Sequence, residues 1–164
     1  MIALKHVLVP TDFSATSDVA LRYGKAFADA FGATLHVIHI IEEPYGQPWA
    51  VEAYGFSLAA LQDEWVKEAD NRMGKVLTDD EKSKLKAVTA TVLGHPVMEI
   101  LRYAKENAID LVVMGTHGRG PLSHVVMGSV AERVVRMAPC PVLTVRHPQH
   151  EFVVPDALVA VSSA

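Results

Sequence analysis

Glycine is concentrated in one stretch of the sequence, GTHGRGPLSHVVMGS (115–129), which follows the apolar run LVVM and holds four of the ten glycines. Glycine adopts positive φ without strain and lets a backbone N–H approach a phosphate oxygen with no Cβ in between. The stretch ends at Gly128 and Ser129, where a helix is predicted to begin, and the free amides and dipole of a helix N-terminus attract anions. These residue types in this order predict a phosphate-binding turn.

The residues of this stretch have different expected roles. Gly115, Gly118 and Gly120 would shape the turn, and Arg119 would bring a mobile positive charge to its rim. The amide and hydroxyl of Ser129 would complete the cradle at the start of the helix. The simpler alternative is that the glycines only end a strand and cap helices, and for any single glycine that alternative is preferred.

Other motifs for phosphate binding, hydrolysis and metal binding do not fit. A Walker A loop requires Gly-Lys-Ser/Thr where this chain has GPL (120–122), and a dinucleotide fingerprint requires glycines in PTDFS (10–14), which has none. The segment VMGSVAE (126–132) lacks the Gly-x-Ser-x-Gly turn of serine hydrolases, so we expect no catalytic serine. His36 and His39 are three apart in a predicted strand and so point to opposite faces, which argues against a dedicated metal site.

Five short β-rich runs alternate with stretches of helical periodicity along the chain. Such alternation is typical of a parallel sheet covered on both faces, and the continuous apolar run LVVM suits a strand buried on both sides. We therefore predict a doubly wound α/β fold. The predicted strands are HVLVP (6–10), TLHVIHII (34–41), AVTATVL (87–93), DLVVMG (110–115) and PVLTVR (141–146).

Capping residues and apolar periodicity predict four helices between these strands. The charged segment TDDEKSK (78–84) is interpreted as a solvated turn. The predicted helices run from Ser14 or Thr16 to Gly32, from Leu58 to Val76, from Pro96 through Ala104, and from Ser129 to Pro139.

Two segments are expected to meet at one edge of the sheet. Ligands of an open parallel sheet bind beyond the carboxyl ends of the strands, near the point where the strand order reverses. PTDFS (10–14) leaves the first strand there, and the glycine-rich stretch (115–129) leaves the fourth. Asp12 is then either a helix cap or a contact to a nucleotide, and its place beside the glycine-rich stretch favours the nucleotide.

The glycine spacing also resembles a family motif. Gly115, Gly118, Gly128 and Ser129 fit the pattern Gly-x2-Gly-x9-Gly-Ser/Thr, and the chain is similar to the universal stress protein family from residue 1 to about 147. The similarity includes VLVPTDFS, FGATLHVIHI, the GHP turn (94–96), MGTHGRG and GSVAERVVRMAPCPVLTVR. Members of the family that keep the motif bind ATP, and the resemblance places this chain among them.

This resemblance implies a five-stranded sheet with the strand order 3-2-1-4-5 and a site for ATP, with AMP and ADP as alternatives and Mg²⁺ carried by the phosphates. It implies that Asp12 lies near the ribose and that backbone groups around Ile40 hold the adenine, between apolar walls from Met114 and Pro10. The glycines and the start of the last helix would hold the phosphates. The expected binding residues are Pro10, Thr11, Asp12, Ile40, Met114, Gly115, His117, Gly118, Arg119, Gly120, Gly128, Ser129 and Val130.

Composition and charge limit the other classes of function. The formal net charge of −4 and the pI of about 6.0 provide no basic field for DNA or RNA. No run approaches the ~20 apolar residues of a membrane helix, and the N-terminus lacks the pattern of a signal peptide. The single cysteine, Cys140, has no disulfide partner in the chain. We therefore expect a cytoplasmic protein with one α/β domain (1–147) and a C-terminal tail (148–164).

Three functions remain open at this point. The first is a nucleotide-binding stress-response or signalling module, and the second is a slow ATPase or phosphotransferase that uses Arg119, His117 and Asp12. The third is an adapter that acts through its dimer surface and the long connection 42–57 without a ligand. Phosphoryl transfer needs more charged groups than this motif offers, so we prefer the first and assign no catalytic residue. The resemblance implies a homodimer formed through the strand 141–146, with the tail as a candidate part of the interface, and the protein partner is unknown.

Overall fold

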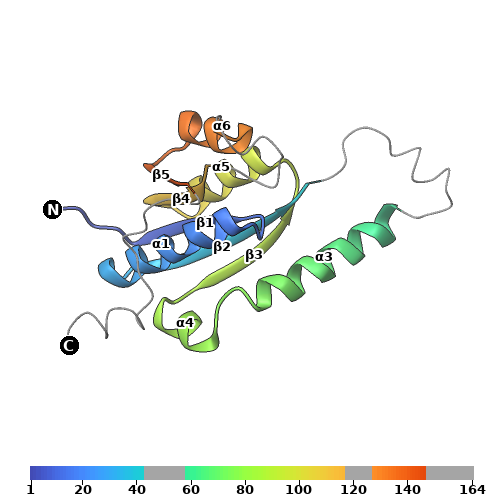
Figure 1. Ribbon diagram of the computed structural model, residues 1–164, viewed down its shortest axis with the longest axis horizontal. Helices are drawn as coiled ribbons and strands as arrows, with labels where there is room; N and C mark the ends of the chain where they lie inside the picture. Colours follow the sequence, from blue (N-terminus) through green and yellow to red (C-terminus); the bar gives the residue numbers. More distant parts are fainter. Residues whose placement is uncertain (43–57, 117–126, 147–164) are drawn as a thin grey trace.

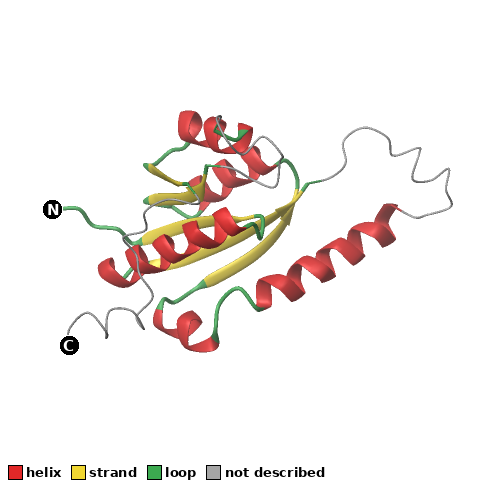
Figure 2. Cartoon of the chain, viewed as in Figure 1, coloured by secondary structure: helices red, strands yellow, loops and turns green. Residues whose placement is uncertain are grey.

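A five-stranded parallel sheet forms the centre of the computed structural model, which describes residues 1–42, 58–116 and 127–146. Its strand order, β3-β2-β1-β4-β5, is the predicted one, and the doubly wound α/β fold is confirmed. Figure 1 shows the path of the chain, and Figure 2 shows its helices and strands. The strands are β1 (His6–Thr11), β2 (Thr34–Ile41), β3 (Val88–Leu93), β4 (Leu111–Gly115) and β5 (Val142–Val145). The helices are α1 (Ala15–Phe31), α3 (Leu58–Gly74), α4 (Asp79–Lys84), α5 (Pro96–Glu106) and α6 (Ser129–Met137).

Alternate side chains of the strands enter two apolar cores, one on each face of the sheet. The first core joins odd-numbered residues of β1 and β2, such as Val7 and Leu35, to α1 and to Met73 of α3. The second core joins even-numbered residues, such as Leu8 and Ile38, to α5 and α6. In Figure 1, α1 lies in front of the sheet. The central strands are therefore buried on both sides, as the apolar run LVVM indicated.

Local capping sets the helix boundaries. Ser14 is the N-cap of α1, and its hydroxyl accepts a hydrogen bond from the Ser17 N–H at 3.2 Å. Gly32 ends this helix at φ 64°, in the left-handed region that favours glycine. The starts of α5 at Pro96 and of α6 at Ser129 agree with the predicted boundaries.

The charged segment 78–84 contains a short helix, α4, and is not the solvated turn that its charge suggests. The Thr78 hydroxyl accepts a hydrogen bond from the Glu81 N–H at 3.2 Å, and the Glu81 carboxylate accepts one from the Thr78 N–H at 2.9 Å. This reciprocal capping box satisfies two backbone donors that a helix start leaves free. Glu81 also pairs with Lys25 of α1 at 2.7 Å, which links α4 to α1.

Helix α1 lies so close to β1 that there is no room for a side chain at Gly24. A Cβ at this position would lie 2.3 Å from Val9 Cγ2 and 3.5 Å from Leu35 Cδ1. Val9 and Leu35 are fully buried, and side chains in a close-packed core have little space to move aside. Glycine is therefore required here in spite of its low helix propensity.

We expect Gly24→Ala to destabilise the protein, because the added methyl group forces α1 away from β1. The expected loss is about 1–3 kcal/mol in the free energy of unfolding, measured by urea denaturation. Gly74→Ala is the matched control, since Gly74 is also a helical glycine but nothing lies within 4 Å of its added Cβ. This control should be as stable as the wild type or more stable, and equal stability of Gly24→Ala would contradict the close contact.

A chain of three polar side chains lies near the amino ends of β1 and β2. His36 Nδ1 lies 3.0 Å from the Tyr103 hydroxyl, and His36 Nε2 lies 3.1 Å from His6 Nδ1. Burial, with a smaller effect of the charge on His6, lowers the pKa of His36 to about 4. The neutral His36 ring thus points to α5, whereas His39 donates a hydrogen bond to the Thr11 carbonyl on the other face of the sheet. The two histidines therefore lie on opposite faces of the sheet, as predicted.

We expect acid to destabilise the protein through His36. A histidine of the unfolded chain has a pKa of about 6.5, so between pH 6.5 and pH 4 the unfolded state binds a proton that the folded state does not. The stability that neutral His36 contributes is complete well above pH 6.5 and falls by about 3 kcal/mol as the pH approaches 4. His36→Gln does not titrate and can bond to the same two partners, so it should lose less stability. Urea unfolding at pH 7 and pH 4.5 measures both losses, and equal losses would rule out His36 as the cause.

Candidate functional site

The predicted binding residues of β1 and β4 lie where the strand order reverses. The two strands are parallel neighbours, with Leu8 opposite Val112, although β2 and β3 separate them in the sequence. From β1 the sheet continues through β2 and β3 on one side, and from β4 it continues to β5 on the other. Asp12 follows the end of β1 and Gly115 ends β4, so both lie at the switch point where open α/β sheets bind ligands.

One part of this edge is apolar. Ile40 of β2, Met114 of β4 and Val130 of α6 all pack in the second core, together with Met127. Met114 is buried, whereas Ile40 and Val130 keep part of their surface exposed. Pro10 is buried near the end of β1. The fold therefore gathers three residues of the expected binding set, from three different elements, into one apolar cluster.

Asp12 is held in the turn between β1 and α1 but is not the cap of the helix. Its Oδ1 accepts a hydrogen bond from the Ser14 N–H at 3.0 Å, whereas the cap of α1 is the Ser14 hydroxyl. Partial burial raises the pKa of Asp12, but hydrogen bonds from Ser14 and Ser17 outweigh this effect and leave the pKa below its ordinary value. Asp12 is therefore an ionised hydrogen-bond acceptor at neutral pH.

Buried hydroxyl groups connect this turn to the first helix. Thr11 Oγ1 accepts a hydrogen bond from the Phe13 N–H at 3.0 Å and lies 3.2 Å from Ser17 Oγ. The Ser17 hydroxyl donates to the Ser14 carbonyl at 2.9 Å. Ser17 is absent from the expected binding set, and the spacing Ser14-x-x-Ser17 is the sequence signal that could have indicated its part in the turn.

Phe13 also takes a part in this turn that the sequence did not indicate. Its backbone has φ 60°, in the left-handed region that a bulky residue rarely adopts. Its ring lies 4.4 Å from the His39 ring between centroids, and the guanidinium carbon of Arg72 lies 4.0 Å from the Phe13 ring centroid. Residues from β2 and α3 therefore contact the turn that carries Asp12. A phenylalanine between Asp and Ser carries no sequence signal for such a conformation.

Strand β4 and helix α1 approach each other closely at Gly115. A Cβ at this position would lie 2.7 Å from Thr16 Cγ2 and 3.3 Å from the Thr16 carbonyl carbon. The φ of Gly115 is not positive. Glycine is therefore required at this position because a side chain does not fit, and not because of its backbone conformation. A side chain here would push the first turn of α1, and with it Asp12, away from β4.

The N-terminus of α6 has backbone amides that the helix itself does not use. Gly128 donates its N–H to the Thr116 carbonyl at 2.7 Å, which differs from the expectation that Gly128 offers an amide to a phosphate. The N–H groups of Ser129 and Val130 belong to the first turn and have no acceptor within the helix. Gly128 has φ −59° and ψ 146°, which any residue adopts. An anion at this end of α6 would therefore meet the amides of Ser129 and Val130.

Part of the expected set lies outside the described residues. The undescribed part of the glycine-rich stretch includes His117, Gly118, Arg119 and Gly120. Residues 43–57 of the long connection and the tail 148–164 also lie outside the described residues. The described members of the set lie in β1, β2, β4 and α6 or directly next to them.

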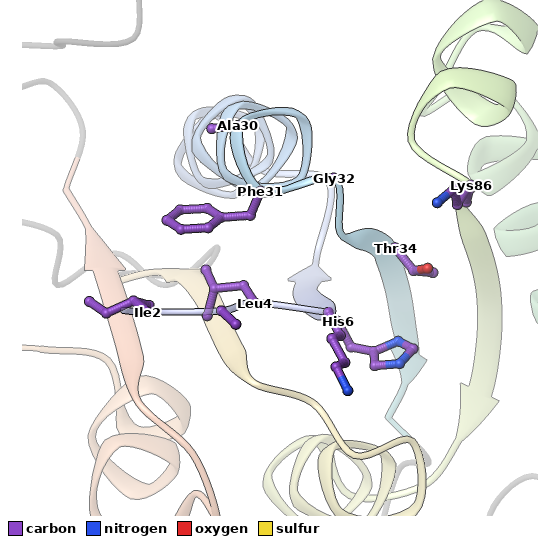
Figure 3. Close-up of a pocket in the computed structure, with 10 residues that line it drawn as sticks. Ile2, Leu4, His6, Ala30, Phe31, Gly32, Thr34 and Lys86 are labelled. Carbon is purple, nitrogen blue, oxygen red and sulfur yellow. The ribbon is translucent and has the colours of Figure 1, made fainter.

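A groove of about 580 Å³ lies at the opposite, amino edge of the sheet. It is lined by residues 2–6, by the end of α1 and by Thr34 and Lys86. Figure 3 shows the Phe31 ring on one side of the groove and Ile2 and Leu4 on the other. The expected nucleotide contacts lie at the carboxyl ends of the strands, so this groove is separate from the candidate site.

Residues 1–42, 58–116 and 127–146 form neither a metal-binding cluster nor a membrane-spanning helix. No three His, Cys, Asp or Glu side chains of these residues gather closely enough to hold a metal ion. Among the helices formed by the same residues, none is both long and apolar enough to cross a membrane.

We expect Gly115→Ala to destabilise the protein by about 1–3 kcal/mol, because the added Cβ overlaps with the Thr16 methyl group. The double variant Gly115→Ala/Thr16→Ser removes that methyl group and should recover part of the loss. Thermal or urea unfolding of the wild type, both single variants and the double variant measures the coupling. Strictly additive effects of the two substitutions would show that the contact does not limit position 115.

Comparisons with known proteins agree with this geometry. The model of the Universal stress protein family matches residues 3–146. A universal stress protein of Methanocaldococcus jannaschii is 30% identical over 157 residues, which cover 88% of this chain and 96% of that protein. The solved structure of universal stress protein UspA from Lactobacillus plantarum has a TM-score of 0.74 at 26% identity, with 89% of this chain and 100% of that chain covered.

A further solved structure is that of a universal stress protein in complex with cAMP. It is 26% identical to this chain, with a TM-score of 0.56, and the match covers 88% of this chain and 98% of that chain. The family model covers all five strands of the sheet, and the curated relative matches over nearly its full length. This chain therefore belongs to the universal stress protein family.

Proposed function

We propose that this chain binds an adenine nucleotide, in the first place ATP, at the carboxyl edge of the sheet between β1 and β4. One observation carries the proposal: the Asp12 carboxylate, the apolar cluster with Ile40 and Met114, and the uncapped N-terminus of α6 lie at the same edge. The three features suit different parts of a nucleotide, namely the ribose hydroxyls, the base and the phosphates. The related structure with cAMP supports an adenylate as the ligand class.

The phosphate end of the ligand would lie at the start of α6. The amides of Ser129 and Val130 and the Ser129 hydroxyl are the donors that we assign to it, with Gly118, Gly120, Arg119 and His117 as further contacts expected from the motif. Mg²⁺ would enter with the phosphates, because this ion keeps most of its water shell and needs few protein ligands. AMP and ADP would compete for the same base and ribose contacts.

Nucleotide occupancy would make the chain a stress-response or signalling module whose state depends on ATP. A homodimer through the strand 141–146 is part of this proposal, and the place of β5 at the edge of the sheet supports it. In the described sheet β5 is an edge strand with β4 as its neighbour, and an edge strand offers unpaired backbone groups to a second chain. The cytoplasmic location and the protein partner stay predictions.

Isothermal titration calorimetry on nucleotide-free protein, with ATP and Mg²⁺, tests the proposal. We expect saturable binding by the wild type and a loss of about tenfold to a hundredfold in affinity for Asp12→Ala, since a hydrogen bond to a charged group contributes about 1.5–3 kcal/mol. Asp18→Ala is the control, because Asp18 is an exposed carboxylate in the first turn of α1. Its affinity should equal that of the wild type.

A second variant in the same titration addresses the phosphate end. The backbone angles of Gly128 are open to any residue, so Gly128→Val should fold, and its side chain would occupy the space of the phosphates. We expect it to abolish binding. No heat of binding to the wild type at millimolar ATP would refute the proposal, and lower thermal stability of Asp12→Ala with unchanged affinity would assign Asp12 a structural role only.

A further inference from the structure

The turn between β1 and α1 holds a conformation that its own sequence disfavours. Phe13 has φ 60°, and a residue with a Cβ populates this region only when its surroundings hold it there. The Phe13 N–H bonds to Thr11 Oγ1 at 3.0 Å, which fixes one side of the turn. The other side is fixed by the hydrogen bond from the Ser14 N–H to Asp12 Oδ1. The orientation of Asp12 therefore depends on the residue next to it.

Contacts from two distant elements hold the Phe13 side chain. The guanidinium carbon of Arg72, near the end of α3, lies 4.0 Å from the Phe13 ring centroid, which is within the range of a cation–π interaction. The His39 ring of β2 lies 4.4 Å away at an interplanar angle of 39°. His39 is itself held, because its Nδ1 donates to the Thr11 carbonyl at 2.8 Å. Phe13 is thus fixed by the sheet and by Arg72 of α3, which follows it by about 60 residues.

Arg72 contacts the ring from an exposed position on the surface of α3. The next residue, Met73, is buried in the first core and fixes the end of the helix against the sheet. The buried Met73 therefore fixes the backbone position from which the Arg72 guanidinium reaches Phe13. An arginine suits this position because its planar, weakly hydrated group stacks on an aromatic face better than an ammonium group does.

We propose that Arg72 is a positioning residue for the nucleotide site: its stacking on Phe13 holds the left-handed turn that presents Asp12 to the ligand. This inference rests on the proposed function, because Asp12 is the group through which Arg72 would affect binding. Arg72 itself does not touch the nucleotide. Without the stack, the turn relaxes to conformations that Phe13 prefers, and the carboxylate of Asp12 is presented less often in the binding geometry.

A double-mutant cycle between positions 72 and 12 separates positioning from a general loss of stability. Calorimetry with ATP and Mg²⁺ is carried out on the wild type, Arg72→Ala, Asp12→Ala and the double variant. We expect Arg72→Ala to weaken ATP binding about threefold to tenfold, and to have less than a twofold effect when Asp12 is already replaced by alanine. Arg72→Lys keeps a cation over the ring and should recover part of the affinity.

The matched control is Lys67→Ala, which removes another exposed cation from the same helix and should bind ATP as the wild type does. Wild-type affinity in Arg72→Ala would overturn the inference while the proposed function stands. If Arg72→Ala weakens binding equally in the wild type and in the Asp12→Ala variant, the inference is also overturned, because Arg72 would then not act through Asp12.

Hydrogen exchange in the ligand-free protein gives a readout that does not depend on nucleotide binding. The Ser14 N–H, which donates to Asp12, should exchange at least about threefold faster in Arg72→Ala than in the wild type. The Glu81 N–H, which donates to Thr78 in the α4 capping box, is the internal reference and should not change. If the wild type binds no nucleotide, the proposed function fails, and unchanged exchange at Ser14 then shows that Arg72 does not position the turn either.

Discussion

The close packing of α1 against β1 and β4 sets the geometry of the sheet edge that carries the candidate site. The helix meets β1 at Gly24 and β4 at Gly115 at distances that leave no room for a Cβ at the first position and very little at the second. These two contacts fix both the height of α1 above the sheet and the place of its first turn. Because Asp12 and the N-cap Ser14 directly precede that turn, the packing of one helix also determines where the charged residue of the candidate site lies.

The two ends of the sheet use polar side chains in different ways. At the amino end, His36 and Tyr103 bond to each other within the protein, and burial keeps His36 neutral. At the carboxyl end, Asp12 stays ionised because backbone and hydroxyl donors stabilise its negative charge. A neutral, partly buried pair serves the stability of the fold, whereas an ionised carboxylate beside an open helix N-terminus can interact with a ligand.

The candidate site combines elements that are distant in the sequence, and each contributes a different physical property. The turn after β1 carries the charge, β2, β4 and α6 supply the apolar cluster, and the start of α6 supplies free amides. The stack of Arg72 on Phe13 adds α3 to these elements. Strain at Phe13 is tolerated because the surrounding contacts hold it, which is a common arrangement next to functional sites.

The fold class and most helix and strand positions could be predicted from the sequence alone. These features depend on local signals, namely the apolar run LVVM, the N-cap Ser14, the C-cap Gly32 and Pro96 at the start of α5. The resemblance of the glycine motif to a known family indicated the strand order and the expected contacts. Among the described helices α4 was misread, because the charge of the segment 78–84 hid the capping box formed by Thr78 and Glu81.

The roles of several of these residues depend on contacts between elements that are distant in the sequence. Position 115 has no room for a Cβ because Thr16 lies against it. The Gly128 N–H is already bonded to the Thr116 carbonyl. The contact between Arg72 and Phe13 joins residues about 60 positions apart. No local pattern encodes such contacts, because they arise from the distance between packed elements and not from the spacing of residues along the chain.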